Sequence, residues 1–172
     1  MKISKKTVYK NKWFQIIDNH YIETKKNYFT IQIPDSSVIL PITTDEEFII
    51  IKQYRETLNN YSLELPAGFI EKDENPIDTA KRELFEETGY KSNNFNYLGI
   101  GRLMINRTNS VQHLFVAKEA IKFCISAARL LPSNPAAVAI FAPTSASKIP
   151  PKNPPIPAPM ANIPVIIFLA IP

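Results

Sequence analysis

Proline divides this sequence into two parts that cannot fold in the same way. Eleven of the 15 prolines lie in residues 120–172, which contain no glycine and no acidic residue. Proline fixes φ and removes a backbone donor, so repeated prolines exclude helices and central strands. We therefore expect a globular domain in residues 1–119 and a proline-rich, atypical tail in residues 120–172.

Two explanations of the tail stay open. It is either a native proline-rich segment, largely disordered or weakly docked, or the translation of a shifted reading frame. Alanine, proline and isoleucine dominate it, which favours the shifted frame. Around its beginning, only Lys118–Leu131 has a composition that suits a helix.

Charge and cysteine content exclude several classes of protein. Residues 1–119 hold 16 basic and 16 acidic residues, so the net charge of +4 comes from four scattered residues of the tail. Without a basic stripe, we expect no nucleic-acid partner. The lone Cys124 and the absence of a zinc pattern favour a reducing, cytoplasmic setting. No apolar run suits a membrane span or a secretory signal.

Apolar periodicity predicts one helix among several strands. The strands are expected at Phe29–Ile33, Ser37–Ile42, Glu47–Gln53, Tyr61–Leu65, Tyr97–Ile105 and Val111–Ala117. The helix is expected at residues 76–88, because Asn75 suits the N-cap, Pro76 the first helical position and Gly89 the C-terminal stop. This order predicts a mixed α/β domain.

One face of this helix gathers three carboxylates. At 3.6 residues per turn, Glu83, Glu86 and Glu87 are neighbours. Carboxylates this close repel one another, and a hard divalent cation such as Mg²⁺ removes the repulsion. Taken alone, the three glutamates have two interpretations: a magnesium site, or a solvated acidic face with an Arg82–Glu86 ion pair.

The residues around the helix favour the magnesium site. Gly68 precedes Glu74 by six positions, and Arg82 follows eight positions later, directly before Glu-Leu-Phe-Glu-Glu-Thr-Gly-Tyr. The segment GFIEKDENPIDTAKRELFEETGY resembles the Nudix box, with Tyr90 in a final slot that usually holds an aliphatic residue. Upstream, Gln53-Tyr-Arg-Glu and Glu64-Leu-Pro-Ala-Gly are similar to the ADP-ribose pyrophosphatase branch of the Nudix hydrolases, so the resemblance covers about residues 37–118.

The resemblance implies a fold and an activity. The fold is a Nudix-type α/β/α sandwich with a mixed sheet, preceded by a β-extension in residues 1–36 and followed by an atypical C-terminal part. The activity is the Mg²⁺-dependent attack of water on a P–O–P linkage, with Mn²⁺ as the alternative metal. The expected substrate is a small molecule, ADP-ribose or a related nucleoside diphosphate sugar, and the branch commonly forms homodimers.

The resemblance also implies roles for individual residues of the box. Glu83 and Glu87 are the principal metal ligands, with Glu86 and the backbone carbonyl of Ala67 in addition. The groups that orient these ligands are Gly68, Glu74 and Arg82. The catalytic set is Glu86, Glu87 and Arg82.

Two residues upstream of the box are implied on the substrate side. Arg55 is expected to grip phosphate through paired hydrogen bonds, with Glu64 beside it. The alternative for Arg55 is an ion pair with Glu56 or Glu64. The residues alone leave both open.

The chain departs from the family pattern in two places. Residues 92–118 hold no proline, where the ADP-ribose branch often has one, so the substrate stays open. After Glu87 the only acidic residue is Glu119, which lies too early for the loop that usually supplies a further glutamate as ligand or base. Beside the hydrolase, two alternatives remain: a catalytically impaired Nudix-like binding module or decayed gene product, and a proline-rich interaction protein that uses its tail.

Overall fold

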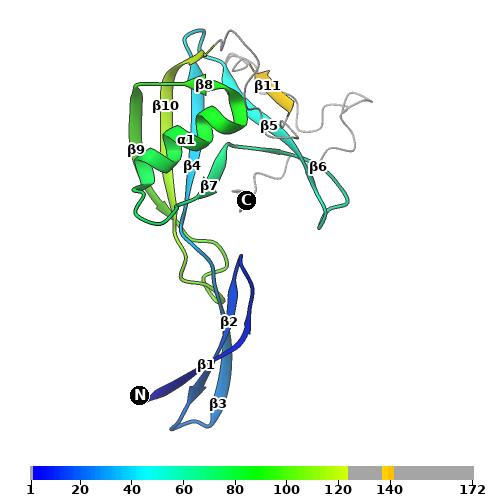
Figure 1. Cartoon of the computed structure of the whole chain (residues 1–172), viewed down its shortest axis with the longest axis vertical. Coiled ribbons are helices and arrows are strands. Elements are labelled where there is room, and N and C mark those ends of the chain that lie inside the picture. The colour runs from blue at the N-terminus through cyan, green and yellow to red at the C-terminus, as the bar shows by residue number, and fades with distance from the viewer. Residues whose placement is uncertain (1, 124–136, 142–172) are drawn as a thin grey trace, which may run out of the picture.

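The structure, a computed structural model, describes residues 2–123 and 137–141 (Figure 1). The strands are β1 (Ile3–Lys10), β2 (Gln15–Tyr21), β3 (Lys26–Gln32), β4 (Ser36–Thr43), β5 (Phe48–Arg55), β6 (Asn60–Glu64), β7 (Ala67–Phe69), β8 (Tyr90–Lys91), β9 (Asn94–Gly101), β10 (Gln112–Lys122) and β11 (Ala137–Phe141). The helix α1 spans Pro76–Thr88. Among the described residues, no helix is long and apolar enough to cross a membrane.

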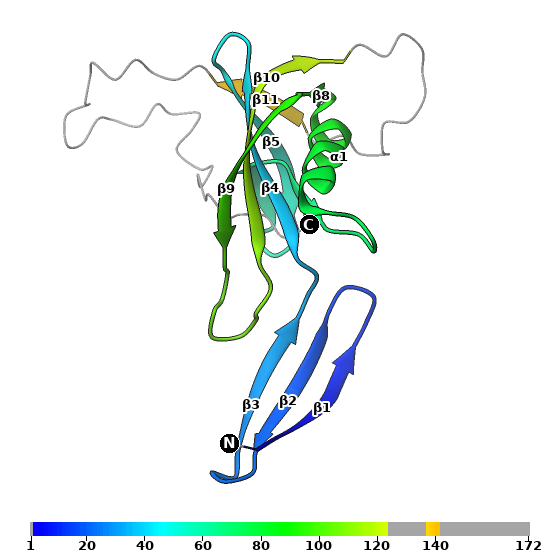
Figure 2. The same cartoon turned by 90° about the vertical axis from the view of Figure 1, so that its left-hand side faces the viewer.

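The strands form two sheets that follow one another along the molecule (Figure 1). Strands β1, β2 and β3 make a small antiparallel sheet, which we call the N-terminal sheet. The other eight strands make one mixed sheet, in which β4 and β10 run parallel and their remaining neighbours are antiparallel. Helix α1 covers one face of this larger sheet (Figure 2). The predicted mixed α/β class is confirmed, and within the described residues α1 is the one helical layer of the expected sandwich.

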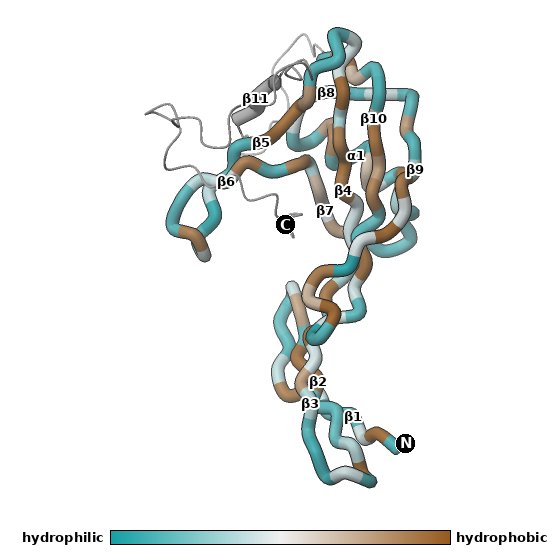
Figure 3. Tube along the Cα trace, turned by 180° about the vertical axis from the view of Figure 1, so that it is seen from behind, coloured by the Kyte–Doolittle hydropathy of each residue, from teal (hydrophilic) through white to brown (hydrophobic). Residues whose placement is uncertain are grey.

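The core lies between α1 and the larger sheet. Ala80 and Leu84 of the helix pack with Ile39 of β4, Ile49 of β5 and Phe115 of β10, and all five are at most 4% exposed. Figure 3 shows hydrophobic stretches along the same three strands. Burial of each large side chain contributes about 1.5–3 kcal/mol, so this cluster fixes where the helix lies on the sheet.

The ends of α1 are those that the sequence predicts. The side chain of Asn75 accepts a hydrogen bond from the N–H of Asp78 at 3.1 Å, and Pro76 is the first helical residue. Gly89 ends the helix in the left-handed region, with a φ of 72°, and its N–H donates to the carbonyl of Phe85. Since both ends are fixed by local residues, the positions of the glutamates on the helix surface follow directly from the sequence.

The six predicted strands are confirmed as β3, β4, β5, β6, β9 and β10, with ends displaced by one to five residues. Strands β1 and β2 belong to the predicted β-extension. Ala67–Phe69, which lie outside the six predicted strands, form a further strand, β7. These residues pair with β4, where Ala67 lies opposite Val38 and Phe69 opposite Ser36.

The predicted helix at Lys118–Leu131 is wrong over residues 118–122, because β10 continues to Lys122. Lys118 pairs with Asn94 of β9, and Ala120 pairs with Thr43 of β4. The expected domain boundary after residue 119 therefore falls inside a strand, and β11 adds a further strand along β5. The rest of the predicted helix and most of the predicted tail lie outside the described residues.

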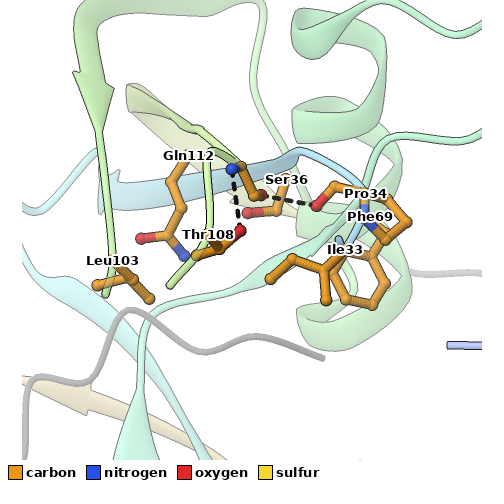
Figure 4. A pocket seen from close by; sticks show the side chains of 8 residues that line it. Ile33, Pro34, Ser36, Phe69, Leu103, Thr108 and Gln112 are labelled. Atoms are coloured by element: carbon orange, nitrogen blue, oxygen red, sulfur yellow. Dashed lines mark hydrogen bonds between the residues drawn. The ribbon is translucent and has the colours of Figure 1, made fainter. Parts of the chain in front are cut away.

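Residues 102–111, between β9 and β10, connect the two sheets. The N–H of Ile31 donates to the carbonyl of Arg107 at 2.7 Å, and the hydroxyl of Ser110 donates to the carbonyl of Pro34 at 2.9 Å. A cavity of about 10 Å³ lies at this junction (Figure 4). It is lined by Ile33, Pro34, Ser36, Phe69, Leu103, Thr108, Ser110 and Gln112. It has room for about one water molecule and none for a nucleotide.

Candidate functional site

Two carboxylates of α1 converge on the backbone of β7. Glu83 and Glu87 lie one helical turn apart, and the N–H of Ala67 donates to Oε2 of Glu87 at 3.0 Å. A Cβ added to Gly68 would lie 1.7 Å from Oε1 of Glu83, so this carboxylate occupies the space above the glycine. We call Ala67, Gly68, Glu83 and Glu87 the carboxylate site.

Arg82 lies at the centre of a network beside the carboxylate site. Its Nε and Nη2 each donate to Glu74 at 3.0 Å, and Nη2 also donates to the carbonyl of Phe69 at 3.1 Å. Its Nη1 donates to Glu83 at 2.6 Å and to Glu86 at 3.1 Å. The Arg82–Glu86 ion pair considered from the sequence is therefore present, and it belongs to a network in which Arg82 binds three glutamates.

Glu74 anchors this network to the start of the helix. The hydrogen bonds from Arg82 lower the pKa of Glu74 to about 2, and the hydroxyl of Thr79 donates to the same carboxylate at 2.7 Å. Thr79 is fully buried. Thr79 and the carbonyl of Phe69 were not predicted from the sequence as partners in this network. The only sequence signal is the position of Thr79 in the first turn, five residues after Glu74.

Burial raises the pKa of Glu87 to about 7. The neighbouring carboxylates of Glu83 and Glu64 raise this pKa as well, while the Ala67 N–H and the Arg55 guanidinium lower it. Burial also raises the pKa of Glu83, against the effect of Arg82. The carboxylate site thus concentrates negative charge that a cation would stabilise.

Arg55 forms its ion pair with Glu64 rather than with Glu56. Its Nε donates to Oε1 of Glu64 at 2.8 Å and its Nη2 to Oε2 at 2.5 Å. The hydrogen bonds to Glu64 raise the pKa of Arg55, and the charge of Glu87 raises it further. The structure therefore brings this pair next to the carboxylate site, while a contact of Arg55 with substrate stays a prediction.

The donor set of the carboxylate site suits a hard divalent cation. Magnesium binds oxygen ligands, usually one or two carboxylates with water and substrate phosphates, and the carboxylates of Glu83 and Glu87 with the carbonyl of Ala67 are of that kind. Within residues 2–123 and 137–141, no three acidic, histidine or cysteine side chains already surround a common point as metal ligands do. Glu83 and Glu86 are instead paired with Arg82.

Glu119, the only acidic residue after Glu87, lies away from the carboxylate site. Its neighbour Ala120 pairs with Thr43 of β4, whereas Ala67 pairs with Val38 of the same strand. Five residues of strand separate these two positions, which is about 16 Å. Glu119 does not supply the late glutamate that the family pattern contains.

The sequence of this chain matches a known protein family. The model of the NUDIX domain matches residues 33–138, which include the whole carboxylate site. The chain belongs to the NUDIX family. Within this NUDIX domain, the segment Gly68–Tyr90 contains the last two residues of β7, the whole of α1 and the loop that joins them.

Two curated relatives align with this NUDIX chain. The methanol dehydrogenase activator of Bacillus methanolicus is 35% identical over 88 residues, which are 51% of this chain and 48% of the relative. The ADP-ribose pyrophosphatase of Bacillus subtilis (strain 168) is 34% identical over 89 residues, which are 52% of this chain and 48% of the relative. The chain therefore spans about half the length of these relatives.

A solved structure shows the same fold. A crystal structure of an ADP compounds hydrolase superimposes with a TM-score of 0.64 and 20% sequence identity. The match covers 83% of this chain and 79% of the other. At this identity the similarity establishes the fold, and the chemistry has to be argued from the residues of this chain.

Proposed function

We propose that this NUDIX protein is a Mg²⁺-dependent hydrolase, with Mn²⁺ as the alternative metal. It cleaves the pyrophosphate of ADP-ribose or a related nucleoside diphosphate sugar into a nucleoside monophosphate and a sugar phosphate. The observation that carries this proposal is the convergence of Glu83 and Glu87 on Ala67–Gly68, against their mutual repulsion. The family match and the activity named for the Bacillus subtilis relative support the reaction class.

Each residue of the site then has a role. Glu83, Glu87 and the carbonyl of Ala67 would hold the cation, and Glu86 would be an additional ligand. The cation, when bound, neutralises charge that develops on the phosphate oxygens. To hold a cation, Glu83 and Glu86 would have to release the guanidinium of Arg82. Glu74 would keep Arg82 in place, because it binds two nitrogens of the guanidinium.

Turnover with matched variants tests the proposal. The purified chain is incubated with ADP-ribose and a panel of nucleotide sugars, with and without Mg²⁺. We expect AMP to be released from ADP-ribose only with Mg²⁺, and Glu87→Gln to abolish this release because it removes a ligand charge. Glu71→Gln changes an exposed glutamate of the loop between β7 and α1 and serves as the control. A folded wild-type protein without any Mg²⁺-dependent turnover contradicts the proposal.

A second candidate function is a non-catalytic NUDIX module that binds nucleotides. The position of Glu119, about 16 Å along β4 from the carboxylate site, favours it, since no later acid in the described part can serve as the base. Isothermal titration calorimetry separates the two functions. Heat of ADP-ribose binding without release of AMP indicates the module, whereas binding with release indicates the hydrolase.

The protein is also proposed to act as a homodimer through its N-terminal sheet. Residues 1–33 hold seven lysines and two acidic residues, whereas residues 34–119 carry a compensating charge of −5. The exposed apolar residues of this sheet and its turns are Ile3, Val8, Tyr9, Trp13, Ile22, Tyr28 and Phe29. A basic apolar surface suits the acidic remainder of a second copy. Light scattering should give a dimer that dissociates with Trp13→Ser, and a monomer of the wild type would refute it.

A further inference from the structure

One edge of the Arg55 guanidinium is occupied by a buried carboxylate. Arg55 is the last residue of β5 and Glu64 the last residue of β6. The Nε and Nη2 atoms of Arg55 bind the two carboxylate oxygens of Glu64 at 2.8 and 2.5 Å. This paired arrangement fixes the plane of the guanidinium, which a single hydrogen bond would not do.

The side chain of Glu64 is too deeply buried to contact a substrate. Its side chain is 3% exposed, and its neighbour across the sheet, Ile51, is 1% exposed. A carboxylate in such a position needs its partner, because an unpaired buried charge is strongly destabilising. The substrate contact expected for Glu64 from the sequence therefore does not fit its burial. Arg55 is more accessible, with 23% of its side chain exposed.

Arg55 lies near the carboxylate site. Among the described residues, Nη1 of Arg55 donates to no acceptor. Arg55 and Glu87 are close enough for the charge of each to shift the pKa of the other. Arg55 also shares a face of the sheet with Ile49, which packs under α1, since alternate residues of a strand point the same way. Arg55 thus lies close to the residues that are proposed to hold the cation.

We propose that Glu64 is a positioning residue, which clamps Arg55 so that its free edge receives a phosphate oxygen of the substrate. This inference rests on the proposed function and deepens it, because it names the residue that orients the arginine expected to bind phosphate. A free arginine side chain has to be ordered when a ligand binds, and that ordering weakens binding. The clamp orders Arg55 before the substrate arrives. Its loss should therefore raise KM and leave kcat nearly unchanged.

Steady-state kinetics with ADP-ribose and Mg²⁺ test the clamp through four variants. Glu64→Gln keeps the shape and removes the charge, whereas Arg55→Lys keeps the charge and loses the paired bonds. We expect each to raise KM by about tenfold and to change kcat by less than about threefold. In the double variant, Glu64→Gln should add less than about twofold to the effect of Arg55→Lys, because both act through one guanidinium. Glu56→Gln is the control, since Glu56 is exposed and forms no ion pair with Arg55.

Two results overturn the inference while the proposed function stands. One is a Glu64→Gln protein that is less stable but keeps the wild-type KM, which would make the pair a purely structural contact. The other is a double variant in which the two effects multiply, which would mean that the residues act independently.

Two further measurements separate failure of this inference from failure of the proposed function. In the first, titration with α,β-methylene ADP-ribose, which cannot be hydrolysed, should show weaker binding to Glu64→Gln than to the wild type. Equal binding by both proteins refutes the clamp alone, and a wild type that neither binds nor hydrolyses refutes both proposals. In the second, the Hε of Arg55 observed by NMR should exchange slowly in the wild type and faster in Glu64→Gln. Fast exchange in the wild type would show that the clamp is absent.

Discussion

A methyl group at position 68 and the carboxylate of Glu83 cannot both occupy their places. The Cβ of Gly68→Ala would stand 1.7 Å from Oε1 and 1.9 Å from Cδ of Glu83. Since normal contacts are about 3.5 Å, the carboxylate has to move by roughly 1.5–2 Å. A displacement of this size at a proposed metal ligand should lower kcat by about 100-fold. The φ of Gly68 is not positive, so the backbone of the new alanine is unstrained.

The same substitution should leave the free energy of unfolding nearly unchanged. Losing the partly exposed Arg82–Glu83 ion pair costs at most about 1 kcal/mol. Replacing glycine by alanine offsets this by about 0.4–1 kcal/mol, because the unfolded chain becomes less flexible. The two effects nearly cancel. Gly68→Ala should therefore separate activity from stability.

The assay combines Mg²⁺-dependent hydrolysis of ADP-ribose with urea unfolding. Gly89→Ala is the matched control, because Gly89 has a φ of 72° and no atom within 4 Å of an added Cβ. It should lower the free energy of unfolding by about 1–2 kcal/mol and keep the activity of the folded fraction. If Gly68→Ala retains kcat within about threefold of the wild type and the same Mg²⁺ requirement, the carboxylate of Glu83 is not held over Gly68 in the working protein.

Three further outcomes follow from the same geometry. The pKa of Glu87 is about 7 in the folded protein and 4.5 ordinarily, so between these pH values the folded metal-free protein binds a proton that the unfolded chain does not. The free energy of unfolding should therefore fall by up to about 3 kcal/mol as pH rises through this window. Urea unfolding with EDTA measures this pH dependence, and Glu87→Gln should flatten it. Arg82→Ala should lower the Tm of the metal-free protein, because three glutamates lose the guanidinium that pairs with them. Added Mg²⁺ should restore part of this Tm loss, as measured by calorimetry. A Tm that does not respond to Mg²⁺ argues against the metal site. Asn75→Ala removes the N-cap of α1 and should cost about 1 kcal/mol in urea unfolding, and an unchanged midpoint would show that the cap carries no stability.

The helix was the most predictable part of this protein, because its determinants are local. Asn75, Pro76 and Gly89 specify its ends, and its period places Glu83 and Glu87 one turn apart. Strand β10 shows the opposite behaviour. Its last residues read as a helix from composition, yet they pair with Thr43 and with Lys91 in the sheet. Pairing partners so far away in the chain override local preference, and no pattern within β10 reveals them.

The sequence by itself determined the family motif, the helix that carries it and the mixed α/β class, since spacing and capping act over a few residues. Only the tertiary structure decided that Glu83 lies over Gly68, that Arg82 joins three glutamates and that Arg55 pairs with buried Glu64 instead of exposed Glu56. Each of these depends on how β5, β6 and β7 approach α1 across the sheet. Sheet pairing and core packing fix that approach, because they join residues that lie far apart in the chain.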